Sequence, residues 1–162
     1  MVASERHTFV DASEEAFAAA VYLRNKHRDG HFTSTLLMSK TKHAPTKTLS
    51  ELPAVLLGTR LATYVGDSIS EPLVKRFFWT DNSCIRNWLR SRLSAYKTFV
   101  SHRIGEIKAA TAPEEWRHVP GGLNNSDIAT RSSLISEDIL AMCFSGPAFL
   151  LLAAERWSKG LP

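Results

Sequence analysis

The amino-acid sequence predicts an α/β domain built on a mixed β-sheet. Three strand-like segments follow one another near the N-terminus with only turn residues between them, as in an antiparallel meander. A long apolar helix then precedes a further strand, so that this strand runs parallel to an earlier one. Two apolar runs, residues 9–10 and 77–80, are each followed directly by an aspartate. Residues at the ends of neighbouring parallel strands lie at the edge where open α/β sheets bind ligands.

The first half of the chain supplies the meander and one buried helix. Strands are expected at residues 7–11, 17–24 and 31–39, with turns at residues 12–15 and 29–30. A loop is expected from Lys40 to Ser50. Residues 51–65 place apolar side chains on nearly all sides of a helix, which is typical of a buried helix. Ser50 fits the N-cap position, and Pro53 fits the first turn, where no intrahelical N–H bond is lost.

The second half of the chain continues the α/β pattern. We expect a strand at residues 75–80, helices at residues 84–93 and 97–110, a strand at residues 116–119 and a short helix at residues 125–131. The predicted order is therefore βββαβααβα. The domain is predicted to cover residues 1–131, and residues 132–162 to form an appended segment. The apolar run at residues 148–152 suits either packing on the domain or docking of a partner.

Length and composition favour a single intracellular domain. With 162 residues, 44% of them hydrophobic, the chain can bury a core without disulfide bonds. The N-terminus lacks the apolar region of a signal peptide. The longest apolar stretch, residues 141–154, is interrupted by Ser145, Gly146 and Pro147, which argues against a membrane span. Cys84 and Cys143 lack zinc-ligand spacing and are expected to be structural thiols in a reducing compartment.

The distribution of positive charge allows two interpretations. The net charge is only +4, but two stretches are strongly basic, residues 24–47 and residues 84–108. Such stretches suit a polyanion such as nucleic acid. A solvated surface is the commoner meaning of any single basic run, and charge alone does not decide between the two.

Four carboxylates are candidates for one acidic site. Asp11 and Asp81 follow the two strands, Glu51 opens the buried helix, and Asp127 lies in a late polar segment. A cluster of carboxylate oxygens suits a hard divalent cation such as Mg²⁺. Two such ions support in-line displacement at phosphorus. The four acids are therefore candidate metal ligands and catalytic residues of a phosphodiesterase.

Each of these acids also has a purely structural interpretation. Asp11 can begin a turn, and Asp81 can act as a helix N-cap. Glu51 interacts favourably with the helix dipole in a first turn. Asp127 can cap a helix or pair with Arg131. The functional interpretation therefore depends on the four acids occurring together in this order of elements.

A resemblance to a known family gives that combination a specific meaning. The matching segments, in chain order, are residues 9–13, 20–24, 51–52, 56–62 and 78–81, Trp88, and residues 97–100, 103–107 and 116–121, with Asn124 and Asp127. This series resembles the ribonuclease H-like fold, and specifically the ribonuclease H domain of BEL/Pao-type LTR retrotransposon polyproteins. A weaker likeness continues through Gly146-Pro147, similar to the segment that joins this domain to the integrase.

The resemblance implies a fold, an activity and partners. The fold is a five-stranded mixed sheet flanked by helices. The activity is endonucleolytic cleavage of the RNA strand of RNA–DNA hybrids with two Mg²⁺ or Mn²⁺ ions, which Asp11, Glu51, Asp81 and Asp127 would bind. The partners are the hybrid and the reverse transcriptase and integrase domains of a parent polyprotein, in the cytoplasm or nucleus, with no membrane.

Substrate contacts are predicted from basic side chains. Arg86 and Arg90 are i,i+4 neighbours on the helix after Asp81 and can contact backbone phosphates together. Lys40 and Lys42 are expected to approach the hybrid as well. The aromatic residues Trp79 and Trp88 are expected in the core rather than against bases. His118 lies near the loop histidine of cellular ribonucleases H, but a packed or exposed role is expected for it.

Departures from the family keep two alternatives open. Residues 47–50 run directly into Glu51, where the family has a longer connection. Ala18 replaces a usual glycine, and Asn125-Ser126 replaces a usual Pro-Ala. These changes favour an inactive module that only binds nucleic acid or a partner protein. The same acids also serve other nucleases of the superfamily, such as an exonuclease or an integrase core.

Overall fold

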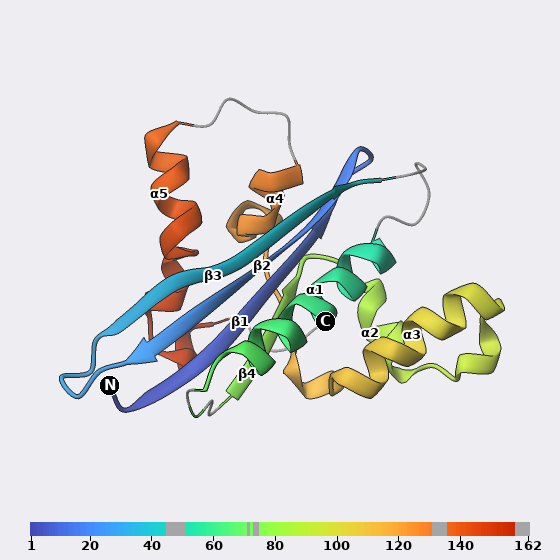
Figure 1. Cartoon of the computed structure of the whole chain (residues 1–162), viewed down its shortest axis with the longest axis horizontal. Coiled ribbons are helices and arrows are strands. Elements are labelled where there is room, and N and C mark those ends of the chain that lie inside the picture. Colours follow the sequence, from blue (N-terminus) through green and yellow to red (C-terminus); the bar gives the residue numbers. More distant parts are fainter. Residues whose placement is uncertain (45–50, 71, 73–74, 131–135, 158–162) are drawn as a thin grey trace.

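The computed structural model describes residues 1–44, 51–70, 72, 75–130 and 136–157. Over these residues the chain forms a five-stranded sheet with the order β3-β2-β1-β4-β5 (Figure 1). The strands are β1 (Ala3–Ala12), β2 (Ala16–Lys26), β3 (Phe32–His43), β4 (Lys75–Thr80) and β5 (Trp116–His118). The mixed five-stranded sheet predicted from the sequence is confirmed.

Helices cover both faces of this sheet. The α-helices are α1 (Glu51–Ser68), α2 (Cys84–Arg90), α3 (Thr98–Ala110), α4 (Asn125–Thr130) and α5 (Glu137–Ser145). Short 3₁₀ turns are η1 (Leu93–Ala95), η2 (Pro113–Glu115), η3 (Gly121–Leu123), η4 (Ala148–Leu151) and η5 (Ala154–Arg156). Figure 1 shows α1, α2 and α3 on one side of the sheet and α4 and α5 on the other.

The register of the sheet sets the position of the strand ends. β1 pairs antiparallel with β2 and parallel with β4. In the parallel pair, Phe9 lies opposite Trp79. Asp11 and Asp81 each follow these residues by two positions, so the register carries both aspartates to the same edge of the sheet. β4 also pairs in parallel with β5, where Thr80 lies opposite His118.

The face under α1 carries an aliphatic core. Its buried members come from the sheet and from nearly all sides of α1, and include Val10, Val21, Leu52, Val55, Leu56 and Leu61. Gly58 lets the helix approach the sheet closely, because a Cβ atom at this position would lie 2.2 Å from Val10 Cγ1. This close contact fixes α1, and with it Glu51, against β1.

The opposite face carries an aromatic core that includes the C-terminal segment. Phe9, Tyr22, Phe77 and Trp79 come from the sheet, and Leu150 and Trp157 come from the segment after α5. Trp79 Nε1 donates to His7 Nδ1 at 3.0 Å, and His7 is fully buried. Residues 149–157 thus contribute to the same hydrophobic core as the sheet.

The predicted element order is correct, but several boundaries differ. β1, β2 and β3 are all longer than expected, and residues 40–43 belong to β3 rather than to a loop. The reason is pairing, since the polar end of β3 is held by hydrogen bonds to β2, where Lys42 lies opposite Phe17. α2 ends at Arg90, three residues earlier than predicted. The N-cap position Ser50 and the boundary at Arg131 lie outside the described residues.

Two further expectations concern cysteines and membranes. Cys84 is exposed and Cys143 is half-buried, and both are free thiols. Among the helices in the described part of the chain, none is long and apolar enough to cross a bilayer.

Candidate active site

The carboxyl ends of β1 and β4 bring two of the predicted acids together. Asp11 is buried at the end of β1, and Asp81 is the first residue after β4. The pKa of Asp11 is raised to about 6, mainly by burial and also by the negative charges of Asp81 and Asp127, against a lowering hydrogen bond from Thr130. Burial also raises the pKa of Asp81, and Asp127 adds to this rise.

Glu51 joins these acids from the first turn of α1. Burial raises the pKa of its carboxyl to about 7, and the charges of Asp81 and Asp11 act in the same direction. A hydrogen bond with the Asn82 side chain opposes this rise in pKa. A carboxylate in a first helical turn normally benefits from the helix dipole. The raised pKa therefore reports the repulsion and burial that Glu51 experiences at this edge.

Asp127 is positioned by a segment that is fastened to the end of β1. Asn124 Nδ2 donates to Val10 O at 2.8 Å, and Ser126 Oγ donates to Phe9 O at 3.0 Å. Thr130 Oγ1 donates to Asp11 Oδ2 at 2.6 Å. These three bonds hold α4 against β1. The four predicted acids, from four separate segments, thus interact with one another at one edge of the sheet.

The donor atoms of this cluster are of the type that binds a divalent cation. The side chains supply only carboxylate oxygens, which hard cations such as Mg²⁺ and Mn²⁺ prefer. Their mutual repulsion is the kind that a bound cation relieves. Their spacing is open, however, since within the described residues no three His, Cys, Asp or Glu side chains lie close enough to hold one ion.

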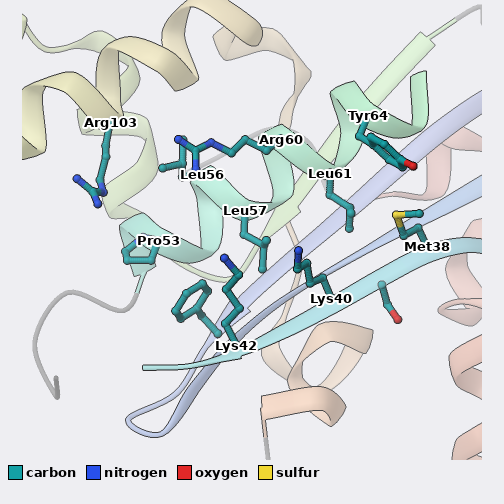
Figure 2. Close-up of a pocket in the computed structure, with 12 residues that line it drawn as sticks. Met38, Lys40, Lys42, Pro53, Leu56, Leu57, Arg60, Leu61, Tyr64 and Arg103 are labelled. Carbon is teal, nitrogen blue, oxygen red and sulfur yellow. The ribbon is translucent and has the colours of Figure 1, made fainter. Parts of the chain in front are cut away.

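The predicted nucleic-acid contacts fall into two separate places. Arg86 and Arg90 line a cavity of about 170 Å³ beside η2, together with Arg117 and Glu114. Lys40 and Lys42 line a different cavity, of about 680 Å³, between β3 and α1 (Figure 2). The i,i+4 pair on α2 therefore projects to one site as predicted. The two lysines are not in that site.

Several residues at the acidic edge were not predicted. Thr130 and Asn82 contact two of the acids, and Ser126 fastens the segment that carries a third. Asn82 follows Asp81 directly in the sequence, so its position beside the acids could have been predicted. His118 interacts with Asp81 and lowers its pKa, so it is nearer the site than the sequence suggested. Trp79 is buried and Trp88 is partly buried against the aliphatic core, as predicted.

The mixed sheet, its strand order and the flanking helices define an RNase H-like fold. A solved structure with this fold is the N-terminal RNase H domain of Rv2228c from Mycobacterium tuberculosis, studied as a fusion with maltose-binding protein. It is 12% identical to the chain, with a TM-score of 0.52, and the match covers 87% of this chain and 96% of that one.

A family model also matches the N-terminal part of the chain. Residues 3–82 match the model described as the Pao retrotransposon-like RNaseH-like domain, which is 80 of the 162 residues. The match covers just under half of the chain, and it contains Asp11, Glu51 and Asp81. No curated protein matches the chain.

Two other solved structures are also similar to the chain. RNase H1 from the halophilic archaeon Halobacterium salinarum NRC-1 is 16% identical, with a TM-score of 0.42, and the match covers 85% of this chain and 97% of that one. LC11-RNase H1, solved in complex with an RNA/DNA hybrid, is 15% identical, with a TM-score of 0.42 and coverage of 75% and 88%.

Proposed function

We propose that the domain is a metal-dependent ribonuclease H that cleaves the RNA strand of RNA–DNA hybrids. The observation that carries this proposal is the mutual interaction of Asp11, Glu51, Asp81 and Asp127 at the carboxyl edge of the sheet. The match of residues 3–82 to the Pao retrotransposon-like RNaseH-like family model supports the choice of substrate. By the same reasoning, the domain would act beside the reverse transcriptase and integrase domains of a parent polyprotein.

The four acids would hold the catalytic metal. Two Mg²⁺ or Mn²⁺ ions, when bound, would activate a water molecule and neutralise charge at the scissile phosphodiester. The protein supplies the rest through its own side chains. Thr130 holds the Asp11 carboxyl from one side by donating to its Oδ2 atom. Asn82 holds the Glu51 carboxyl by a hydrogen bond. Both contacts orient a carboxyl whose pKa is raised and which therefore retains a proton more readily when no cation is present.

The hybrid would be held by cations away from the acids. Arg86 and Arg90 share one cavity, where two guanidinium groups can contact the phosphates of one strand. Lys40 and Lys42 remain predicted hybrid contacts from the other side of α1. Such contacts read the backbone and the A-form shape of the duplex rather than base edges.

A cleavage assay on a hybrid with a labelled RNA strand tests the proposal. We expect cleavage with Mg²⁺ or Mn²⁺ and none with EDTA. Asp81→Asn should lower the rate by about 100- to 1000-fold, because it removes one charge from the cluster. Asp67→Asn is the matched control, since Asp67 is exposed at the other end of α1 and should leave the rate unchanged. Undiminished cleavage by Asp81→Asn would refute the assignment.

Competition among substrates separates this activity from that of related nucleases. An excess of unlabelled hybrid should suppress cleavage, whereas equal amounts of duplex DNA or single strands should not. Stronger competition by duplex DNA would instead favour an integrase-like or exonuclease-like activity on the same acids.

A second candidate function is a binding module without catalysis. The observation that favours it is the open spacing of the acids, since no three of them in the described residues approach closely enough for one ion. Such a module should bind hybrids with a steep salt dependence and never cleave them, with either metal. Arg86→Ala with Arg90→Ala should then reduce the slope of log affinity against log salt by about two. Cleavage at any metal concentration would exclude this candidate.

A further inference from the structure

A long groove lies beside the acidic edge, between β3 and α1. Its volume is about 680 Å³. The floor is apolar and consists of Phe17, Met38, Leu56, Leu57, Leu61 and Tyr64. Tyr64 is 60% exposed, although it is a large aromatic residue. Figure 2 shows Leu56, Leu57, Leu61 and Tyr64 on the helix and Met38 on the strand that faces it.

The rim of the groove is positively charged. Lys40 and Lys42 rise from β3 on one side, and Arg60 and Arg103 approach from α1 and α3 on the other (Figure 2). Among the described residues that line the groove, none is acidic. Arg60 already binds Glu106 through two hydrogen bonds of 2.6 and 2.8 Å. Both lysines are exposed. The rim therefore offers cations on both sides of an apolar floor.

The groove occupies a position where a helix would complete a layer. Lys42, Lys40 and Met38 lie opposite Phe17, Ala19 and Val21, whose side chains belong to the core beneath α1. This part of β3 thus faces the same side as α1. α1 packs against β1 and β2 and also reaches β3, and the groove lies between α1 and β3. From Pro53 to Tyr64, α1 rises by about 17 Å, which is the length of about three helical turns.

We propose that this groove, formed by β3 and α1, docks an amphipathic helix of a partner protein whose apolar stripe is flanked by acidic residues. The apolar stripe would cover the floor, and glutamates or aspartates on its two sides would meet the lysines and arginines of the rim. Helices seat in apolar grooves by contacts spaced at i, i+3, i+4 and i+7. The groove contains none of the four acids, but it includes Lys40 and Lys42, so a partner helix and the hybrid would compete for these two lysines.

The chemistry of the groove favours such a helix over a nucleic-acid strand. A phosphate backbone is satisfied by cations and gains nothing from aliphatic side chains such as Leu56, Leu57 and Leu61. Bases would require aromatic platforms in a row, and the floor is mainly aliphatic. A single small anion would also not need cations on both sides of an apolar floor. An acidic amphipathic helix matches both the floor and the rim.

Binding of a model helix tests the proposal. The probe is a fluorescent, cross-linked peptide of about 15 residues, with leucines at i, i+3, i+4 and i+7 and glutamates on both sides of them. A second peptide replaces every glutamate with lysine. We expect saturable binding of the first peptide only, weakened by salt. Binding of this peptide should change the methyl chemical shifts of the full chain, and the largest changes should be at Met38, Leu57 and Leu61.

Matched variants locate the binding site. Lys40→Glu with Lys42→Glu should weaken binding of the glutamate peptide by about tenfold or more, because two attractive pairs become repulsive. Tyr64→Ala should also weaken it, through lost apolar contact. Lys26→Glu with Lys75→Glu carries the same change of charge on exposed residues at the opposite end of the sheet, and should leave affinity unchanged.

Three outcomes would overturn the proposal. These are an absence of binding at millimolar protein, equal binding of the lysine peptide, or unchanged affinity in the Lys40→Glu, Lys42→Glu variant. Displacement of the peptide by an RNA–DNA hybrid in EDTA is expected, because the hybrid would compete for Lys40 and Lys42. Loss of hybrid cleavage in another variant would have no bearing on the peptide result, so the two proposals fail separately.

Discussion

The domain contains two clusters of charged residues that differ in how their charges are balanced. The carboxylate cluster, Asp11, Glu51, Asp81 and Asp127, lies at the carboxyl edge of the sheet, where each acid is repelled by others and pKa values rise. The arginine cluster, Arg24, Glu5 and His7, lies toward the other end of β1 and β2. There, Arg24 Nη1 donates to Glu5 Oε2 at 2.5 Å.

Arg24 is the fully engaged member of the arginine cluster. Arg24 is 3% exposed, and its other nitrogen atoms donate to Leu150 O and Leu152 O at 2.6 Å. Its guanidinium carbon lies 3.7 Å from the ring centre of Phe32 and 4.6 Å from that of Trp157. Burial raises the pKa of Glu5, but hydrogen bonds from His7 and Arg24 outweigh it, and the net result is a lowered pKa.

The comparison separates a structural use of charge from a functional one. A buried charge with every partner in place holds two parts of the fold together, here the sheet and the C-terminal segment. A group of like charges that repel one another costs stability, and such a cost persists in proteins where a function needs it. Mutations in the two clusters should therefore change stability in opposite directions.

The largest expected effect is at Arg24. Arg24→Met removes the cation, so that Glu5 and two carbonyl groups of the C-terminal segment lose their guanidinium partner. We expect a loss of about 3–5 kcal/mol in the free energy of unfolding, measured by urea denaturation at pH 7. Trp79 fluorescence and the chemical shifts of residues 149–157 should report whether that segment detaches first. A variant as stable as the parent would show that the cluster is not structural.

The carboxylate cluster should respond in the opposite sense. Glu51→Gln removes one repelled charge, so in EDTA it should stabilise the protein by about 1 kcal/mol at pH 8. The folded-state pKa of Glu51 is about 7, above its ordinary value of 4.5. The folded state therefore holds its proton more tightly, and the stability from this group is complete below about pH 4.5 and lost as the pH rises through 7. The difference between the variant and the parent should be small at pH 4.5 and grow up to pH 8.

The difference in unfolding free energy between Glu51→Gln and the parent isolates the effect of Glu51 from that of groups with the opposite pH dependence. Burial lowers the pKa of His7, so the contribution of His7 is lost as the pH falls through the ordinary histidine range. Both proteins contain His7, and its contribution cancels between them. Saturating Mg²⁺ should stabilise the parent more than Glu51→Gln, because only the parent has the full set of acids. A stability difference independent of pH and of Mg²⁺ would contradict this account of the cluster.

The smallest expected effect is at the surface pair of Arg60 and Glu106. The two side chains are 62% and 43% exposed, so solvent screens their attraction despite two short hydrogen bonds. Glu106→Gln should lower the free energy of unfolding by less than about 1 kcal/mol, and less still at high salt. Thermal melts at two salt concentrations measure this. If Glu106→Gln destabilised the protein as much as Arg24→Met, good hydrogen-bond geometry alone, without burial, would explain how the arginine cluster stabilises the protein.

The sequence alone predicted the elements and the candidate site to a large extent. Hydrophobic periodicity gave the order of strands and helices, because period two and period 3.6 are local patterns. Strand β4 was predicted with its observed bounds. The four acids were found because two follow strands and one opens a helix, and these positions can be seen without coordinates. The ends of β3 and α2 were missed because pairing and packing, rather than local propensity, decide where an element stops.

Only the tertiary structure decided how distant parts of the chain meet. Thr130 reaches Asp11 across 119 positions of sequence, and Arg24 reaches Leu150 across 126. No local pattern encodes such contacts, since they depend on the register of the sheet and on the route of the chain after α4. The same holds for the groove between β3 and α1, whose floor and rim come from segments that are separate in sequence. The sequence thus determined which residues are acidic, basic or apolar and on which elements they lie, and the packing of the sheet decided which of them act together.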